Sequence, residues 1–234
     1  MIDLFYWPTP NGQKISILLE ELGLNYQVKA VNILQGDQFS PGFLAVNPNN
    51  KIPAITDPDG PDGLPITIFE SGAIMIYLAE KHGRFLGHGP RQRFEILQWL
   101  AVQLSGIGPM FGQCGHFLGY APEKLPYAID RYKNETIRLY RVLDRHLASS
   151  EFLGGVYSIA DMATWPWIHV RWLHQIDIDQ FPNVKRWYEQ ISARGAVTRG
   201  SSVLADLMEI GNPNPKTFEV FFGKSQLDQK LHSK

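Results

Sequence analysis

The sequence predicts an α/β domain followed by an all-helical domain. Strand-like and helix-like patterns alternate over about the first eighty residues, whereas the chain beyond Arg84 shows only helical spacing of apolar residues. A length of 234 residues leaves room for two domains. We therefore expect domains at 1–86 and 90–205, and a C-terminal extension at 206–234 that is partly docked or disordered.

The first domain is expected to contain a βαβ unit followed by a β-hairpin and a helix. Short apolar or alternating runs predict its strands, and spacings of three and four predict its helices. Gly23 follows the first helix as a C-cap, and Ser71 begins the last one. The expected strands cover 2–6, 26–33, 52–55 and 64–69, and the helices cover 15–22, 40–46 and 71–81.

The second domain is expected to consist of amphipathic helices at 91–104, 126–147, 158–173 and 182–193. Ser158 and Asp161 have the spacing of a capping box at the start of one of them. We assign Trp165, Trp167 and Trp172 of that helix to the core.

Segment 96–122 contains no charged residue, which raises the question of a membrane span. Its glutamines, His116 and the breakers Gly106, Gly108 and Pro109 would be unfavourable in hydrocarbon. We therefore expect a buried, kinked helix and no membrane partner.

Composition excludes several functional classes. The 22 basic and 23 acidic residues leave a net charge of -1, which argues against a nucleic-acid partner. Signatures of metalloproteases, serine hydrolases, P-loop proteins and dinucleotide-binding proteins are absent, and the seven histidines show no metal-ligand spacing, so we expect no metal. A single cysteine and an N-terminus without a secretory pattern indicate a reducing, cytoplasmic location.

Two strand-to-helix junctions carry polar side chains. Thr9 and Asn11 lie where the amides of the first helix could stabilise an anion or a thiolate, although Thr9 could equally be a simple N-cap. Ser71 could bind a carboxylate and Glu70 an ammonium, although a serine there is more often only a cap. Pro53 opens a strand, and a cis bond would leave the Ile52 backbone available to an extended peptide.

Cys114 lies two residues before His116, so a nucleophile beside a base is conceivable. Neighbouring residues in sequence rarely have the required alignment. A partly buried structural thiol is the better interpretation.

These motifs resemble those of the cytosolic glutathione transferases, which have a thioredoxin-like N-terminal domain and an all-helical C-terminal domain. The family-wide resemblance lies in NKIPAI, FESGAI and SIAD at 50–55, 69–74 and 158–161, and extends over the chain to about Arg194. The sequence is also similar to the Nu-class bacterial members and their fungal nitrogen-regulator relatives in PTPNG, Gln38-Phe39, GPM and YAIDRY at 8–12, 38–39, 108–110 and 127–132. That subgroup is known for glutathione-dependent disulfide-bond reductase activity.

The resemblance implies roles for these positions. The γ-glutamyl end of glutathione should lie on Glu70 and Ser71, and the cysteinyl backbone should pair with Ile52 beside a cis Pro53. Gln38 and Lys51 should lie near the glycyl carboxylate, and Thr9 and Asn11 should face the sulfur. Arg131 matches a basic residue that the subgroup directs towards the site, although an exposed helical arginine is an equally simple interpretation.

The expected function is therefore that of a glutathione-dependent disulfide-bond oxidoreductase. No cysteine lies at the first helix, so the reactive sulfur must come from glutathione, reduced or oxidised. Thr9 and Asn11 would stabilise its thiolate for exchange with small-molecule thiols and disulfides. Glutathione conjugation, hydroperoxide reduction and a non-catalytic interaction module remain alternatives.

A disulfide acceptor is expected to bind where the helical domain faces the first one. Met110, Phe111 and Phe117 are the candidate wall of that pocket, although plain core is an equally consistent assignment. The family resemblance also implies a homodimer.

Overall fold

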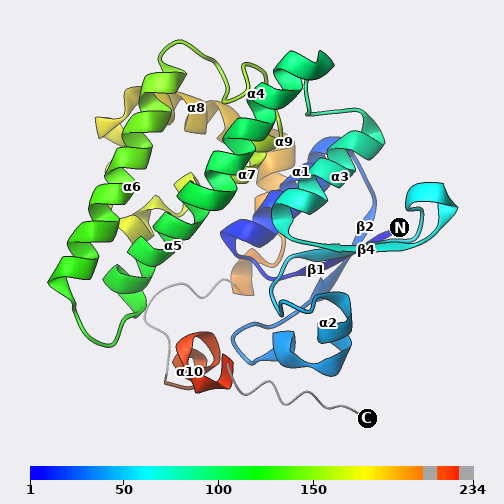
Figure 1. Ribbon diagram of the computed structural model, residues 1–234, viewed down its shortest axis with the longest axis horizontal. Coiled ribbons are helices and arrows are strands. Elements are labelled where there is room, and N and C mark those ends of the chain that lie inside the picture. The colour runs from blue at the N-terminus through cyan, green and yellow to red at the C-terminus, as the bar shows by residue number, and fades with distance from the viewer. Residues whose placement is uncertain (208–214, 227–234) are drawn as a thin grey trace.

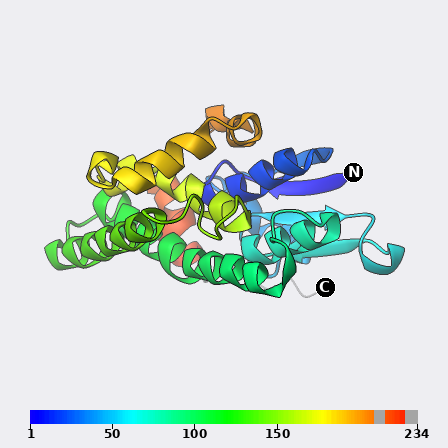
Figure 2. The same cartoon turned by 90° about the horizontal axis from the view of Figure 1, so that it is seen from above.

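The computed structural model describes residues 1–207 and 215–226, and it confirms an α/β domain followed by an all-helical domain (Figures 1 and 2). The first domain contains one sheet of four strands in the order β2-β1-β3-β4. β1 pairs in parallel with β2 and antiparallel with β3, which pairs antiparallel with β4. This is the topology of a thioredoxin-like domain. The strands are β1 (Ile2–Tyr6), β2 (Tyr26–Ala30), β3 (Ala54–Asp57) and β4 (Ile66–Phe69).

Local signals begin and end the helices of this domain. They are α1 (Pro10–Leu22), α2 (Pro41–Val46) and α3 (Ser71–His82). Thr9 caps α1, and Gly23 ends it in the left-handed conformation, with φ 70°. β2 is shorter than the predicted 26–33 because the side chain of Asn32 accepts a hydrogen bond from the amide of Leu34 and turns the chain.

The helices of the second domain are α4 (Gly89–Val102), α5 (Gly108–Gly115), α6 (Pro126–Leu147), α7 (Ile159–His169), α8 (Pro182–Ser192) and α9 (Gly195–Ser202). The sequence did not indicate α9, which packs along α1. Gly200 makes this contact possible because a Cβ there would lie 2.6 Å from the backbone of Ile17. Ser16 Oγ also donates to the Gly200 carbonyl at 2.7 Å.

The kink expected in segment 96–122 consists of two π-helical turns, at Gln103–Ile107 and His116–Tyr120. They separate α4 from α5 and end α5, so the segment is two helices rather than one. Such turns are frequent at functional sites because they redirect side chains. The first turn brings Gln103 into the interior, where it is fully buried. Among the described residues, no helix has the length and apolar content needed to cross a membrane.

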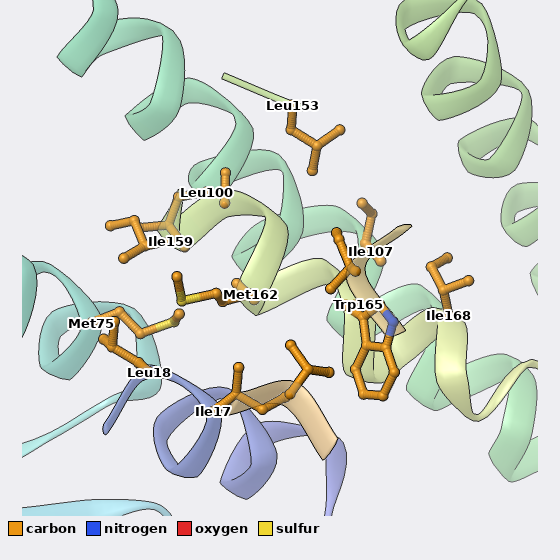
Figure 3. Packing of buried hydrophobic residues seen from close by; sticks show 14 of the residues in the cluster. Ile17, Leu18, Met75, Leu100, Ile107, Leu153, Ile159, Met162, Trp165 and Ile168 are labelled. Carbon is orange, nitrogen blue, oxygen red and sulfur yellow. The ribbon is translucent and has the colours of Figure 1, made fainter. Parts of the chain in front are cut away.

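A shared apolar core joins the two domains (Figure 3). Its labelled side chains include Ile17 and Leu18 of α1, Met75 of α3, Leu100 of α4 and Met162 of α7. The domains therefore hold each other in place, and groups on either side of their junction keep fixed relative positions.

The predicted capping box of α7 is present: Ser158 Oγ accepts from the Ala160 amide, and Asp161 accepts from the Ser158 amide at 3.0 Å. Of the three tryptophans assigned to the core, only Trp165 is deeply buried. The assignment is wrong for Trp172, which is 56% exposed. Trp167 is half-buried and lines a pocket.

The predicted extension at 206–234 lies partly outside the described residues. Within it, α10 (Pro215–Phe222) is described, and a 3₁₀ turn follows at Lys224–Gln226. In Figure 1, α10 lies below the helical domain. Phe222 contacts the rings of His116 and Tyr120 in that domain.

Candidate functional site

The start of α1 presents Thr9 and Asn11 at the end of β1. Thr9 Oγ1 accepts a hydrogen bond from the amide of Gly12 at 3.3 Å. Gly12 is required because a Cβ there would lie 2.3 Å from the carbonyl oxygen of Trp7. This close turn places polar side chains at the amide end of a helix, where negative charge is stabilised.

The loop before β3 presents backbone groups to the same region. The Ile52–Pro53 peptide bond is cis, as the family resemblance implied. Within the described chain, the N–H and C=O of Ile52 have no backbone partner. Asn47 Nδ2 donates to the Lys51 carbonyl at 2.6 Å and holds the loop in place. An extended ligand can therefore pair with Ile52 as an added strand would.

Glu70 and Ser71 form the third part of the site, between β4 and α3. Glu70 has φ 68°, a conformation that is unfavourable for a residue other than glycine. Strain of this kind is often concentrated at functional sites. The Glu70 carboxylate is exposed and accepts from Asn49 Nδ2 at 3.3 Å, whereas Ser71 is only 7% exposed.

These groups border three adjoining hollows. The first, which we call the polar cleft, has a volume of about 430 Å³. Its lining residues are Asn11, Asn47, Lys51, Ile52, Pro53, Glu70 and Ser71. The second, the central cleft, has a volume of about 640 Å³ and shares Asn11, Lys51 and Ile52 with the first. The two clefts therefore adjoin.

The central cleft is bordered by both domains and by the C-terminal segment. Thr9 and Gln38 come from the first domain, Trp167 from α7, and Phe221 from α10. Gln38 is buried, and its Oε1 has no hydrogen-bond partner among the described residues. Such an unpaired acceptor is available to a ligand.

The third hollow, the apolar pocket, has a volume of about 680 Å³ and meets the central cleft at Thr9, Trp167 and Phe221. Phe111 and Leu173 contribute to its apolar walls. The joined hollows thus pass from a polar end to an apolar end, with Thr9 at the point where the character changes.

The apolar pocket also contains two unpartnered polar atoms. His174 Nδ1 and Trp167 Nε1 are buried without a hydrogen-bond partner in the described chain. Burial lowers the pKa of His174 to about 4, so this imidazole is neutral near pH 7. A mainly apolar ligand with one or two polar atoms would suit these walls.

Lys14 lies behind the polar cleft, in the first half of α1. Its Nζ donates to Ser71 Oγ at 3.3 Å and to Gln103 Oε1 at 2.7 Å. The side chain is 1% exposed, and burial lowers its pKa to about 7. Sequence reasoning missed this residue because a lysine on a helix is ordinarily exposed.

Three predicted site residues lie outside these hollows. Arg131 is exposed on α6, with its guanidinium 3.9 Å from the Glu135 carboxylate. Met110 packs against the core, and Phe117 stacks on Tyr132 at a centroid distance of 5.3 Å. Of the predicted acceptor wall, only Phe111 lines the apolar pocket. The predicted roles of Arg131, Met110 and Phe117 stay predictions.

The only cysteine in the sequence lines none of the three hollows. Cys114 is 1% exposed, and burial raises the pKa of its thiol. It therefore has the character of a structural thiol. Among the described residues, no group of three or more His, Cys, Asp and Glu side chains could hold a metal ion.

One pocket residue was within reach of sequence reasoning. Trp167 follows Trp165 by two positions, and residues two apart on a helix face different directions. With Trp165 in the core, Trp167 therefore faces a different side of the helix. No comparable local signal indicates His174 or Phe221, whose positions depend on how distant segments pack.

Two family models match the chain. The N-terminal domain of glutathione S-transferase matches residues 9–81, and the C-terminal domain matches residues 126–190.

Individual relatives cover most of the chain. The disulfide-bond oxidoreductase YfcG of Escherichia coli is 52% identical over 84% of this chain and 92% of its own length. A glutathione transferase family member from Pseudomonas fluorescens, solved with two glutathione molecules bound, is 48% identical, covers 86% of this chain and 92% of its own, and has a TM-score of 0.81. A glutathione transferase from Pseudomonas putida, solved with one glutathione disulfide per subunit, is 46% identical over 86% of this chain and 91% of its own, with a TM-score of 0.82.

Proposed function

This chain belongs to the glutathione S-transferase family, and on that basis we propose that it is a glutathione-dependent disulfide-bond oxidoreductase. The observation that carries this proposal is the position of Thr9, where the central cleft meets the apolar pocket. Its hydroxyl oxygen accepts from Gly12, which leaves the hydroxyl hydrogen for a sulfur atom. The buried Cys114 does not compete for this role.

Glutathione would extend from the polar cleft into the central cleft. Its γ-glutamyl end would contact Glu70 and Ser71, its cysteinyl backbone would pair with Ile52, and its glycyl end would approach Gln38 and Lys51. Two contacts support this orientation: the Glu70 carboxylate complements the charge of the ammonium, and the neutral Ser71 hydroxyl can donate a hydrogen bond to the carboxylate. We propose Arg131 as a further contact of glutathione. To make this contact, its guanidinium would have to move from its place beside Glu135.

Thr9, Asn11 and the amides of α1 would stabilise the thiolate of bound glutathione. A hydrogen bond to a charged acceptor contributes about 1.5 to 3 kcal/mol, which corresponds to a decrease of about one to two units in the pKa of the thiol. The thiolate would attack one sulfur of a disulfide, forming a mixed disulfide and releasing the other sulfur as a thiolate. A second glutathione thiolate would then attack the mixed disulfide, yielding glutathione disulfide and the second thiol of the substrate.

The acceptor disulfide would occupy the apolar pocket beside Thr9. Phe111, Trp167 and Phe221 supply aromatic contact area there, and Met110 and Phe117 are further proposed contacts from the same stretch of chain. The neutral His174 adds a polar atom without adding charge.

Steady-state assays would test the proposal by comparing a small disulfide, an organic hydroperoxide and an aryl halide, each with and without glutathione. We expect glutathione-dependent reduction of the disulfide to have the highest kcat/KM. A preference for the hydroperoxide or the aryl halide would replace the proposed activity with one of the other two. Absence of glutathione binding by calorimetry at millimolar concentration would instead indicate an interaction module.

We propose further that the protein is a cytoplasmic homodimer. Its single cysteine is typical of a reducing compartment, and Phe94 on α4 is 67% exposed, so apolar surface is available to a second copy. Light scattering coupled to size-exclusion chromatography tests the dimer directly.

A further inference from the structure

The polar cleft is backed by a buried lysine that has no carboxylate partner in the described part of the chain. We propose that Lys14 is a positioning residue that supplies the positive charge for the α-carboxylate of the γ-glutamyl end of glutathione, acting through Ser71. This inference rests on the proposed binding of glutathione in the polar cleft. It explains how the cleft selects a carboxylate, and it implies that Lys14 takes up a proton when the ligand binds.

Lys14 is held in place by two hydrogen bonds. Its Nζ donates to Gln103 Oε1 at 2.7 Å and to Ser71 Oγ at 3.3 Å, and within residues 1–207 and 215–226 it forms no ion pair with a carboxylate. An ammonium group has three N–H donors, and no acceptor for the third is found among the described residues. The positive charge is therefore solvated by two neutral oxygens and is otherwise enclosed by protein.

A buried ammonium without a counterion destabilises a fold, and apolar residues of similar volume often replace buried charges without loss of stability. Packing alone therefore gives no reason for a lysine here. Its immediate neighbour does, because Ser71 is both the acceptor from Lys14 and a lining residue of the polar cleft.

The Ser71 hydroxyl can connect the cation to a ligand. Its oxygen accepts from Lys14, and its own hydrogen remains available to a carboxylate in the cleft. Hydrogen bonds in such a chain polarise one another, so the ammonium makes Ser71 a stronger donor. The carboxylate of the ligand in turn supplies the negative charge that the neutral acceptors of Lys14 lack.

Few charged groups of the described chain lie around Lys14. Glu70, which precedes α3, acts on it through space and favours its protonated form, but burial has the larger effect and lowers its pKa to about 7. Helix α9 packs against α1, and its Arg199 donates a hydrogen bond to Glu20 near the C-terminal end of α1. In α7, Asp161 accepts hydrogen bonds from the Ser158 amide and from Trp187 Nε1. The π-helical turn contributes the uncharged Gln103.

The sign of the linkage follows from these positions. Without ligand, Lys14 is largely neutral above pH 7. A carboxylate beside Ser71 favours the charged ammonium, so binding raises the pKa of Lys14 and takes up a proton from solution. The uptake should be greatest between about pH 7 and the pKa of the complex, and should vanish well below pH 7, where Lys14 is already charged.

Isothermal titration calorimetry tests this with S-methylglutathione, which has no thiol whose ionisation would release a proton. Titrations at pH 8 in two buffers of different ionisation enthalpy give the number of protons taken up. For the wild-type protein we expect uptake of close to one proton. Lys14→Met should abolish the uptake and raise the Kd about 10- to 100-fold. Lys185→Met, which removes an exposed lysine of α8, is the matched control and should change neither quantity.

A second ligand separates charge recognition from general damage to the fold. The S-methyl analogue of 4-aminobutanoyl-cysteinyl-glycine lacks only the α-carboxylate, so Lys14→Met should change its Kd less than about threefold. An equal loss of affinity for both ligands, or wild-type binding without proton uptake, would overturn the role of Lys14 and leave the proposed function standing. Failure of the wild-type protein to bind S-methylglutathione at all would instead overturn the proposed function.

Discussion

Thr9 and Gly12 are joined by a hydrogen bond in which the threonine is the acceptor: the Gly12 amide donates to Thr9 Oγ1 at 3.3 Å. The cap of α1 thus uses a lone pair of the hydroxyl and not its hydrogen. One side chain can therefore begin the helix and donate to a sulfur atom at the same time. An N-cap and a catalytic contact are not alternatives at this position.

Replacing Thr9 by alanine should lower kcat/KM for glutathione-dependent disulfide reduction about 10- to 100-fold, since one hydrogen bond to a thiolate is lost. Thr9→Ser retains the hydroxyl and should stay within about threefold of the wild type. Calorimetry should show little change in affinity for S-methylglutathione in either variant. Full activity of Thr9→Ala would remove Thr9 from the mechanism.

Cys114 should be dispensable. Its thiol is buried and its pKa is raised, so the exchange reaction should depend on the glutathione sulfur alone. Cys114→Ala should retain disulfide reduction within about twofold, assayed well below its unfolding temperature. Iodoacetamide should label the native wild-type protein slowly and the unfolded protein fully. Loss of activity in a folded Cys114→Ala protein would contradict a mechanism in which glutathione supplies the only reactive thiol.

Phe221 should contribute to acceptor binding from α10. It lines both the central cleft and the apolar pocket, so Phe221→Ala should raise the KM for a bulky aromatic disulfide about five- to tenfold. The KM for a small aliphatic disulfide should change little. Phe218→Ala is the matched control, because Phe218 lies on the same helix and packs on Phe222. Equal effects of the two substitutions would indicate that α10 acts only through its overall position.

Lys14 should make the stability of the ligand-free protein depend on pH. Its pKa is 10.5 as a free side chain and about 7 in the fold, so between these values the unfolded chain binds more protons. Raising the pH from 7 to 9 should therefore stabilise the wild-type protein relative to Lys14→Met, by up to about 1.4 kcal/mol per pH unit. Urea unfolding of both proteins at pH 7, 8 and 9 measures the difference. A pH-independent difference would show that Lys14 does not titrate in this range.

Asp161 should be essential for stability and not for chemistry. Its Oδ1 accepts from the Leu153 amide at 2.9 Å and from Trp187 Nε1 at 2.8 Å, and its Oδ2 accepts from the Ser158 amide at 3.0 Å. Asp161→Ala leaves these buried donors unpaired and should lower the free energy of unfolding by about 3 to 5 kcal/mol. The exposed Asp130→Ala should change it by less than about 0.5 kcal/mol. Comparable urea midpoints would contradict this role.

The polar groups of the site could be found from sequence because each lies at the end of an element. Thr9 stands before a helix, Pro53 before a strand, and Ser71 where a strand passes into a helix. Such positions are recognisable from caps, prolines and apolar periodicity, which are local properties. The family resemblance then united them in one glutathione site.

Other groups could not be found in this way. Lys14 has the same local pattern as an exposed lysine, and only the approach of Ser71 and Gln103, 57 and 89 positions away, makes it a buried cation. Trp172 shows the converse. Its sequence pattern predicted a place in a mainly apolar helix, but α7 ends at His169 and Trp172 lies exposed in the 3₁₀ turn at Arg171–His174.

The sequence by itself therefore determined the two-domain architecture, the types of most elements and the polar residues that border the clefts, because short-range backbone chemistry specifies them. The tertiary structure alone decided that α9 packs on α1, that Phe221 of α10 reaches the apolar pocket, and that Lys14 loses contact with water. Burial and proximity across the chain arise from the packing of distant segments, and no local pattern contains that information.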